Sequence, residues 1–345
     1  MQPHQIAIPF IKPDKVSKPF YVITSIFNPI RFSSRWDTYF KWEKHILDSG
    51  AHLITVEAAF GDREFVITKP YNERHQIINV RAASEIWLKE NLNNIGTRYL
   101  PDDCEYFAFM DADIFMMSPT WVDDVIHKLQ HFPIVQMFHD LIYLGPRGEY
   151  LYTRVSFARK WIEGAELKYN GKVVQKPVAS IYGDPYNDKD QKDKGEWGPP
   201  GGCWAYRRKE YEECDGLIDF CILGAADWYM AAGICGFMDQ VLAPHSDGYR
   251  DALLQWERKA LKAFRKNIGM LDQTVAHHWH GKNIDRGYGD REQILKNAKF
   301  NPATDLKTGS NGVIKLHDDG SERMRILAMH CHQYFDRRNE DSVDK

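Results

Sequence analysis

A strand–helix–strand pattern near the N-terminus constrains the fold more than any other feature of this sequence. Residues 19–27 are rich in β-branched and aromatic side chains and stop at Asn28-Pro29, which predicts a buried strand. Residues 33–47 carry large apolar side chains near helical spacing and stop at Ser49-Gly50, and residues 52–57 predict a second strand. Because the connections are short, we expect the βαβ unit of a parallel sheet.

The same alternation continues along the chain. We expect helices over 82–94, 121–132 and 251–267, strands over 106–110 and 134–138, and a strand or turn leading into a helix over 216–233. Residues 183–202 are rich in Asp, Lys, Gly and Pro without periodicity, which is typical of a lid or a disordered loop. The sequence therefore predicts an α/β fold with a mostly parallel central sheet flanked by helices.

Composition excludes several other classes of protein. The 345 residues are 27% charged and 43% hydrophobic, which excludes a disordered, collagen-like or multi-span membrane chain. The six cysteines show no CxxC pair or zinc spacing and predict reduced, buried thiols. The N-terminal residues lack a basic n-region, and no apolar run approaches about 18 residues, so we expect no signal peptide, no membrane span and a cytoplasmic location.

Two carboxylates follow the apolar run 106–110, in the order Asp111-Ala112-Asp113. Ligands of open α/β sheets bind at the carboxyl ends of strands, where residues i and i+2 can turn toward one point. Carboxylates there suit Mg²⁺ or Mn²⁺ bridged to a diphosphate leaving group. The alternative is that these carboxylates only cap a turn.

A histidine-rich run, His277-His278-Trp279-His280, precedes Gly281-Lys282. Imidazole is a ligand that Mn²⁺ accepts, and Lys282 with Arg286 could hold phosphate. An ordinary surface turn is the alternative.

A third group combines glycines, tryptophans and a carboxylate. Gly201 and Gly202 permit close approach of the backbone to a ligand, and Trp204 and Trp228 offer ring faces on which a sugar or base can stack. Asp227 is a candidate general base, although it could equally be an N-cap at the start of a helix.

In order along the chain, these segments resemble the metal-dependent glycosyltransferases of the GT-A fold, and more closely cytoplasmic sugar transferases of phage and giant-virus type. The resemblance runs from about Pro19 to Asp341. Its landmarks are residues 24–28, 89–92, 110–114, 202–208, 216–220, 224–230 and 278–281. It implies a leader (1–18), a Rossmann-like catalytic domain (19–299) and a helical C-terminal extension (300–345) packed on the core. The catalytic domain would comprise a nucleotide-sugar half (19–140) and an acceptor half (141–299) with a lid loop (183–201).

The resemblance also implies roles for individual residues. Mn²⁺ or Mg²⁺ would be held by Asp111, Asp113 and His280, with His278 left open as an alternative to His280. Asp227 would be the catalytic base of an inverting enzyme, although the usual Glu-Asp pair is Ala226-Asp227 here. The nucleotide-sugar donor, expected to be UDP-linked, would contact Thr24, Phe27, Arg81, Asp111, Ala112, Asp113, Gly202 and Lys282, and the lid and acceptor would involve Trp197, Trp204 and Trp228.

The acceptor is open at this stage. The resemblance to viral-type enzymes suggests a flipped 5-hydroxymethyl pyrimidine in phage DNA, modified in the host cytoplasm. The formal net charge of −3 counts against binding to DNA. The basic run 258–266 could nevertheless form a local surface that binds the DNA backbone, or it could simply be a solvated helix face. A protein, glycan or small-molecule acceptor, a non-catalytic nucleotide-sugar or DNA-binding module, and a nucleotidyltransferase are the alternatives. The oligomeric state is not predicted.

Overall fold

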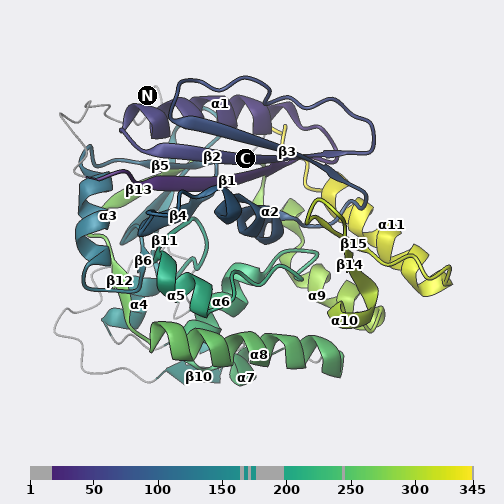
Figure 1. Cartoon of the computed structure of the whole chain (residues 1–345). Helices are drawn as coiled ribbons and strands as arrows, with labels where there is room; N and C mark the ends of the chain where they lie inside the picture. The colour runs from purple at the N-terminus through teal and green to yellow at the C-terminus, as the bar shows by residue number, and fades with distance from the viewer. Residues whose placement is uncertain (1–17, 164–166, 170–171, 176–197, 243–244, 344–345) are drawn as a thin grey trace.

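The centre of the molecule is a seven-stranded sheet in the order β12-β6-β11-β4-β1-β2-β3 (Figure 1). The computed structural model describes residues 18–163, 167–169, 172–175, 198–242 and 245–343. The strands of this sheet are β1 (Tyr21–Phe27), β2 (His52–Phe60), β3 (His75–Ala82), β4 (Tyr106–Met110), β6 (Ile134–Gln136), β11 (Cys203–Arg207) and β12 (Ile268–Met270). Of these seven strands, β11 alone runs antiparallel to its neighbours, so the predicted mostly parallel α/β sheet is confirmed.

Helices cover both faces of this sheet. The α-helices of the described residues are α1 (Ser33–Asp48), α2 (Lys89–Gly96), α3 (Trp121–Leu129), α4 (Phe157–Ile162), α5 (Arg208–Glu213), α6 (Ala226–Cys235), α7 (Met238–Val241), α8 (Asp247–Phe264), α9 (Tyr288–Asn297), α10 (Pro302–Asp305) and α11 (Glu322–Asp336). The helices predicted over 33–47, 121–132 and 251–267 correspond to α1, α3 and α8. The helix predicted over 82–94 is wrong in its first half. There β3 ends at Ala82, and α2 begins only at Lys89.

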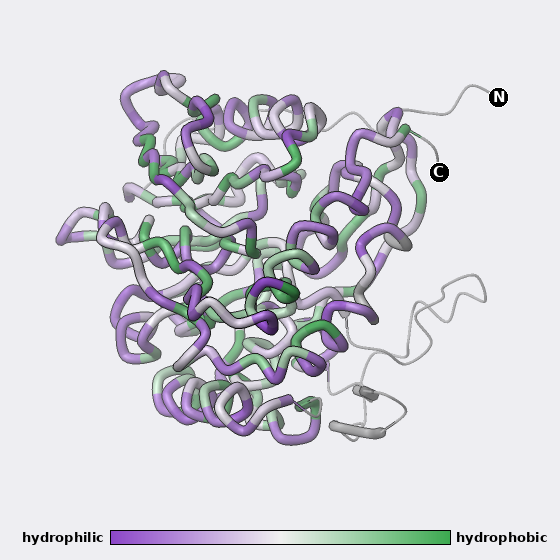
Figure 2. The backbone as a smooth tube through the Cα atoms, turned by 90° about the vertical axis from the view of Figure 1, so that its right-hand side faces the viewer, coloured by the Kyte–Doolittle hydropathy of each residue, from purple (hydrophilic) through white to green (hydrophobic). Residues whose placement is uncertain are grey.

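The alternation of side chains along each strand divides the core between the two faces. On β4, Phe107 and Phe109 pack with residues of α2, α6 and α8, whereas Ala108 and Met110 pack with residues of α1 and α3. Hydrophilic and hydrophobic residues alternate along the outer helices, as expected for helices with one buried face (Figure 2). Burial on both faces explains why the parallel strands β1, β2 and β4 are nearly continuous apolar runs, whereas β3 at the edge of the sheet alternates between buried and exposed residues.

A second sheet of four short strands, in the order β5-β13-β7-β8, was not predicted from the sequence. It comprises β5 (Ile114–Met116), β13 (Thr274–His277), β7 (Asp140–Leu144) and β8 (Tyr150–Val155), and two further pairs of strands are β9 (Leu167–Tyr169) with β10 (Lys172–Gln175) and β14 (Leu306–Thr308) with β15 (Ile314–Leu316). Strands of three to six residues are too short for a period to be recognised. The second sheet places β13 beside the segment that follows β4.

The C-terminal residues fold back onto the N-terminal half. The Glu340 carboxylate accepts hydrogen bonds from Arg35 (2.5 and 2.7 Å) and Arg338 (2.6 Å), and it is 1% exposed. The Asp341 carboxylate accepts from the backbone N–H groups of Ser33 and Ser34, at the start of α1. The C-terminal residues therefore fix the position of the N-terminus of α1.

Parts of the sequence predictions fall outside the described residues. These are the leader up to residue 17 and most of the loop 183–201, including Trp197. Within the described ranges, no helix combines the length and the apolar character needed to cross a lipid bilayer.

We expect Glu340→Gln to lower the free energy of unfolding by about 2–4 kcal/mol at pH 7, because it removes the carboxylate that pairs with the buried Arg338 and the partly buried Arg35. Burial alone would raise the pKa of Glu340, but Arg35 and Arg338 overcome it and hold the pKa at about 2. A carboxyl group with a lowered pKa stabilises the fold above its unfolded value, about 4.5, and that contribution disappears as the pH falls toward 2.

Urea unfolding at pH 7 and pH 3 measures this effect. The cost of Glu340→Gln should shrink at pH 3, whereas the exposed Glu322→Gln should change stability little at either pH. A cost that is the same at both pH values would show that the ion pairs do not carry it.

Candidate functional site

The turn that carries Asp111 and Asp113 begins where β4 ends and leads into β5. The backbone N–H of Asp111 donates to the carbonyl of Gly202 (2.8 Å), and that of Ile114 donates to the carbonyl of Asp111 (3.1 Å). Below the turn, the Thr24 hydroxyl donates to the carbonyl of Met110 (2.8 Å). These bonds place the two carboxylates at the carboxyl edge of the parallel strands, where ligands of α/β sheets bind.

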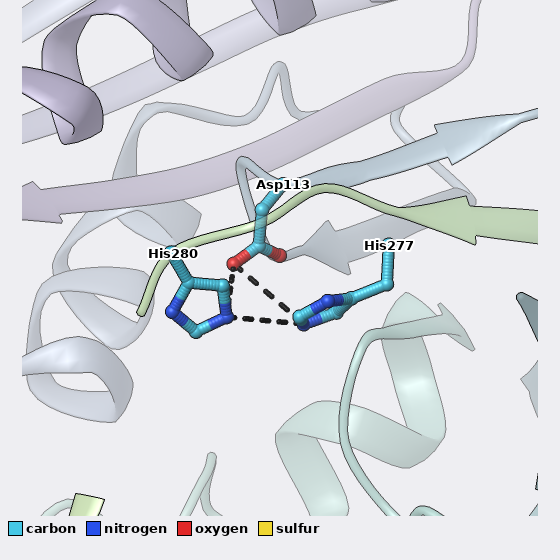
Figure 3. A group of neighbouring side chains, drawn as sticks. All are labelled: Asp113, His277 and His280. Carbon is cyan, nitrogen blue, oxygen red and sulfur yellow. Dashed lines mark hydrogen bonds and ion pairs between the residues drawn. The ribbon is translucent and has the colours of Figure 1, made fainter. Parts of the chain in front are cut away.

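Pairing between β5 and β13 brings the histidine run against this turn. His277 is the register partner of Ile114, and the N–H of His278 donates to the carbonyl of Asp113 (2.9 Å). Asp113 Oδ2 lies 3.2 Å from His280 Nε2 and 3.9 Å from His277 Nε2, and the two nitrogens are 3.1 Å apart (Figure 3). We call Asp113, His277 and His280 the metal group.

The metal group has the chemistry of a cation site. Burial lowers the pKa of His277 to about 3 and that of His280 well below its usual value, with Arg286 adding to both, so the rings are neutral and keep a lone pair. Asp113 Oδ1 is buried and has no hydrogen-bond partner among the described residues. One carboxylate and two imidazoles suit Mn²⁺ and other transition metals better than Mg²⁺.

His278 points to a different environment from its neighbours. Its ring stacks on Phe115, with ring centres 4.0 Å apart and planes 28° apart. The cluster of possible metal ligands in the described part of the chain contains His280 and His277 but not His278. The geometry thus favours His280 between the two histidines left open, and it adds His277.

Asp111 lies beside a lysine rather than in the metal group. Its carboxylate is 3.2 Å from Lys89 Nζ, which also lies 3.7 Å from Glu90. Burial alone would lower the pKa of Lys89, but Asp111, Glu90 and Asp227 together raise it above its usual value. Burial raises the pKa of Glu90 to about 7, despite the nearby ammonium group. Lys89 is therefore a partly buried cation that holds Asp111.

Asp227 lies in the first turn of α6, facing the glycine pair. Its carboxylate accepts from the N–H of Trp228 (2.9 Å), and a Cβ built on Gly201 would lie only 2.6 Å from Asp227 Oδ2. Residue 201 must therefore be glycine for the carboxylate to take this position. A cavity of about 40 Å³, which we call the base cavity, is lined by Asp227, Asp111, Lys89, Glu90, Asn93, Gly201, Gly202, Trp204 and further, mainly apolar residues.

The other residues predicted to contact the donor differ in burial. Thr24 and Phe27 are buried, the former bonded to Met110 and the latter packed on Trp87 and Phe335, so their side chains support the site from below. Arg81 is exposed at the end of β3, with its guanidinium group 4.2 Å from the centre of the Phe65 ring.

Other predicted residues lie around the two carboxylate groups. Ala112 packs against the core cluster on the α1 side, and Gly202 adopts a φ of +95° with its backbone against Phe138. The indole of Trp204 donates to the carbonyl of Pro200 (2.7 Å), and Trp228 is half-buried against the core. Lys282 lines a second cavity, together with Arg286.

Sequence reasoning missed His277 as a ligand and Lys89 as a site residue. The signal for His277 is its spacing of three residues from His280, whereas the sequence prediction assigned only one histidine of this run to the metal. A lysine at the start of a helix gives no such signal, since most lysines are exposed.

No protein-family model matches the chain, and no curated protein matches its sequence. Several solved structures are similar at low identity. S. aureus TarS with UDP-GlcNAc matches over 81% of this chain and 65% of that chain, at 11% identity and a TM-score of 0.40. A mutant of Drosophila β1,4-galactosyltransferase 7 with manganese, UDP-Gal and xylobiose matches over 90% and 99%, at 12% identity and a TM-score of 0.36.

The mannosyltransferase PcManGT from Pyrobaculum calidifontis, in complex with GDP-Man and Mn²⁺, matches over 95% of this chain and 73% of that chain, at 12% identity and a TM-score of 0.39. The chain spans just under two thirds of the length of the TarS structure. Similarity at such TM-scores carries no information on activity or ligands.

We expect Mn²⁺ to raise the melting temperature of the wild-type protein, because a ligand of the native state adds about 2.7 kcal/mol at 100 times its Kd. Asp113→Asn, His277→Ala and His280→Ala should each lose most of this increment. Differential scanning fluorimetry with and without Mn²⁺ measures it, and comparing increments corrects for differences in basal stability.

His278→Ala is the matched control. Because its ring packs on Phe115 outside the metal group, this variant should keep the increment. An increment lost in His278→Ala and kept in His277→Ala would overturn the assignment of ligands.

Proposed function

We propose that this protein is a glycosyltransferase that transfers a sugar from a nucleotide-sugar donor to an acceptor hydroxyl, with a bound divalent metal. The observation that carries the proposal is the convergence of Asp113, His277 and His280 at the carboxyl edge of the sheet, on the same turn as Asp111, which shares a cavity with the carboxylate of Asp227. The metal group and Asp227 could then perform separate tasks: the metal group would stabilise the leaving group, and Asp227 would accept a proton.

The metal group would hold Mn²⁺, or less favourably Mg²⁺. When bound, the cation would neutralise charge that develops on the leaving nucleoside diphosphate. The donor nucleoside would then lie toward the ends of β1, β2 and β3, where Arg81 is exposed.

Cationic side chains beside the metal group would bind the phosphates. Arg286 Nη2 lies 2.8 Å from His280 Nε2, and Lys282 lines the same cavity. Arg35 and Arg338 are close enough to lower the pKa of His280 further, and the Glu340 carboxylate pairs with both of them. A donor diphosphate would accept charge-assisted hydrogen bonds from Lys282 and from Arg286, whose guanidinium group would turn away from His280 Nε2 to make them.

Asp227 would act as the general base. It would accept the proton of the acceptor hydroxyl as that oxygen attacks the anomeric carbon from the face opposite the diphosphate, which inverts the configuration. Asp111, held by Lys89 in the same cavity, would orient the donor sugar. The apolar side chains of Phe109, Met230 and Ile234, which line the same cavity, would limit the access of bulk water to the reacting atoms.

For the acceptor we propose a 5-hydroxymethyl pyrimidine in DNA, whose primary hydroxyl suits this chemistry. The described feature that supports it is the exposure of Arg258, Lys262 and Lys266 at the end of α8 and just beyond it. Transfer to a duplex with 5-hydroxymethylcytosine should occur, should weaken as salt rises, and should be absent for an unmodified duplex. Donor hydrolysis without any transfer to the modified duplex would place the acceptor in another class.

Asp227→Asn should lower kcat by about 10²–10⁴-fold while leaving the Kd of the donor nearly unchanged, since the amide cannot accept the proton. UDP-GlcNAc, UDP-galactose and GDP-mannose are suitable donors for the assay, and NMR of the product gives the anomeric configuration.

The exposed Asp239→Asn in α7 is the matched control and should keep the wild-type rate. Unchanged turnover in Asp227→Asn would remove the base assignment. Donor binding without turnover in the wild type would favour a binding module instead.

A further inference from the structure

The base cavity holds one ionisable group that the proposed reaction does not use. Lys89, Glu90, Asp111 and Asp227 all line this cavity of about 40 Å³. Asp227 is the proposed base, and Lys89 holds Asp111, so Glu90 is left without a part. If all four groups were charged, one cation would face three anions among mainly apolar side chains. Carboxylates crowded in this way do not all ionise, so we expect one of them to hold a proton.

Burial and local contacts select Glu90 among the three carboxyl groups. The side chain of Glu90 is 4% exposed and that of Asp111 is 30% exposed, while Asp227 is half-buried. Desolvation penalises the charged form most where exposure is least. Burial raises the pKa of Asp111 as well, but the Lys89 ammonium group opposes it and lies closer to Asp111 (3.2 Å) than to Glu90 (3.7 Å). Asp227 accepts the backbone N–H of Trp228, so Glu90 is the least stabilised anion of the three.

A buried acceptor in the same cavity matches a protonated carboxyl group. Asn93 lines the cavity, and its Oδ1 atom is buried without a hydrogen-bond partner among the described residues. Glu90 and Asn93 are three residues apart on α2, so their side chains are neighbours on one face of the helix. An ionised carboxylate only accepts hydrogen bonds, whereas a neutral carboxyl group has an O–H that can donate to this amide oxygen, directly or through one water molecule.

The remaining groups around Glu90 leave this balance unchanged near neutral pH. Tyr206 on β11 and Cys221 both interact with Glu90, but burial raises the pKa of each well above its usual value, so both are neutral. The position of Glu90 in the first turn of α2 favours its charged form, as does Lys89. Burial outweighs both and, with the nearby Asp227, raises the pKa of Glu90 to about 7.

We propose that Glu90 holds a proton at neutral pH, and that its neutral state keeps the Lys89 ammonium group on Asp111 and leaves Asp227 ionised. Glu90 is thus a positioning residue of the site. As the pH rises, its proton passes to solvent, the new carboxylate competes with Asp111 for Lys89, and the added negative charge repels an anionic donor. The effect on the donor rests on the proposed glycosyltransferase function, whereas the proton on Glu90 does not.

The test uses Glu90→Gln, which keeps the size and a hydrogen-bond donor but cannot ionise. A carboxyl group whose pKa rises from 4.5 to about 7 on folding stabilises the fold below pH 4.5, and this contribution is lost as the pH rises through 7. Urea unfolding at pH 5 and pH 8 gives the unfolding constants of both proteins. The ratio of wild type to variant should increase about 50-fold between the two pH values, whereas lost packing alone would give the same ratio at both.

Three further variants separate the contributions. Glu213→Gln, at an exposed position of α5, should show no such increase. Glu90→Leu cannot donate to Asn93, so it should show the same increase but unfold more readily than Glu90→Gln at both pH values. Asn93→Ala removes the acceptor of the neutral form, so its own stability should depend less on pH than that of the wild type.

Infrared spectroscopy detects the proton directly. In protein labelled with ¹³C at the glutamate carboxyl groups, the C=O stretch of a protonated carboxyl group should be present at pH 6 and absent at pH 8.5. In Glu90→Gln it should be absent at both.

Calorimetry with UDP and GDP in Mn²⁺ measures the effect on the donor site. For the nucleotide that binds, the ratio of the Kd at pH 8.5 to the Kd at pH 6 should be about five-fold larger in the wild type than in Glu90→Gln. The comparison of the two proteins removes the titration of the nucleotide itself.

A ratio of unfolding constants that is the same at pH 5 and pH 8, or an infrared band at pH 6 that is unchanged in Glu90→Gln, would overturn the proposal. The expected increase in a wild type that binds neither nucleotide and transfers no sugar would keep the proton on Glu90 and refute the glycosyltransferase function. Nucleotide binding with the same pH dependence in both proteins would overturn the effect on the donor.

Discussion

One backbone hydrogen bond, from the N–H of His278 to the carbonyl of Asp113, positions the whole metal group. It continues the ladder between β13 and β5 by one step beyond the pair of His277 and Ile114. Successive side chains of a strand point to opposite faces, so this register sends His277 toward Asp113 and His278 onto Phe115. A slip of one residue would exchange the two rings and break up the group.

The histidine loop (residues 277–281) also contacts the C-terminal residues. The indole of Trp279 donates to the carbonyl of Ser342 (2.7 Å), and a Cβ built on Gly281 would lie 3.0 Å from the carbonyl oxygen of Arg338. Glu340 joins Arg338 to Arg35 near the end of β1. The C-terminal residues thus tie the histidine loop to the first βαβ unit, so that parts far apart in the sequence determine the geometry of one site.

The sequence predicted the parallel sheet and the helices α1, α3 and α8 because these elements are long and strongly periodic. The second sheet was missed because its strands have three to six residues, and β3 was missed because exposed Gln76, Asn79 and Arg81 interrupt its apolar pattern. Asp113 and His280 could be proposed from motif spacing. The choice among three neighbouring histidines could not, since it depends on strand register, and the pairing of Lys89 with Asp111 depends on tertiary packing.

The central claim is that one divalent cation is bound by Asp113, His277 and His280. Electron spin-echo envelope modulation of bound Mn²⁺ tests it directly, because ¹⁴N couplings count the coordinated imidazoles. We predict couplings from two histidine nitrogens in the wild type, and from one in either His277→Ala or His280→Ala where Mn²⁺ at high concentration still binds. A bound Mn²⁺ signal without nitrogen coupling, or one unchanged by both substitutions, would contradict it.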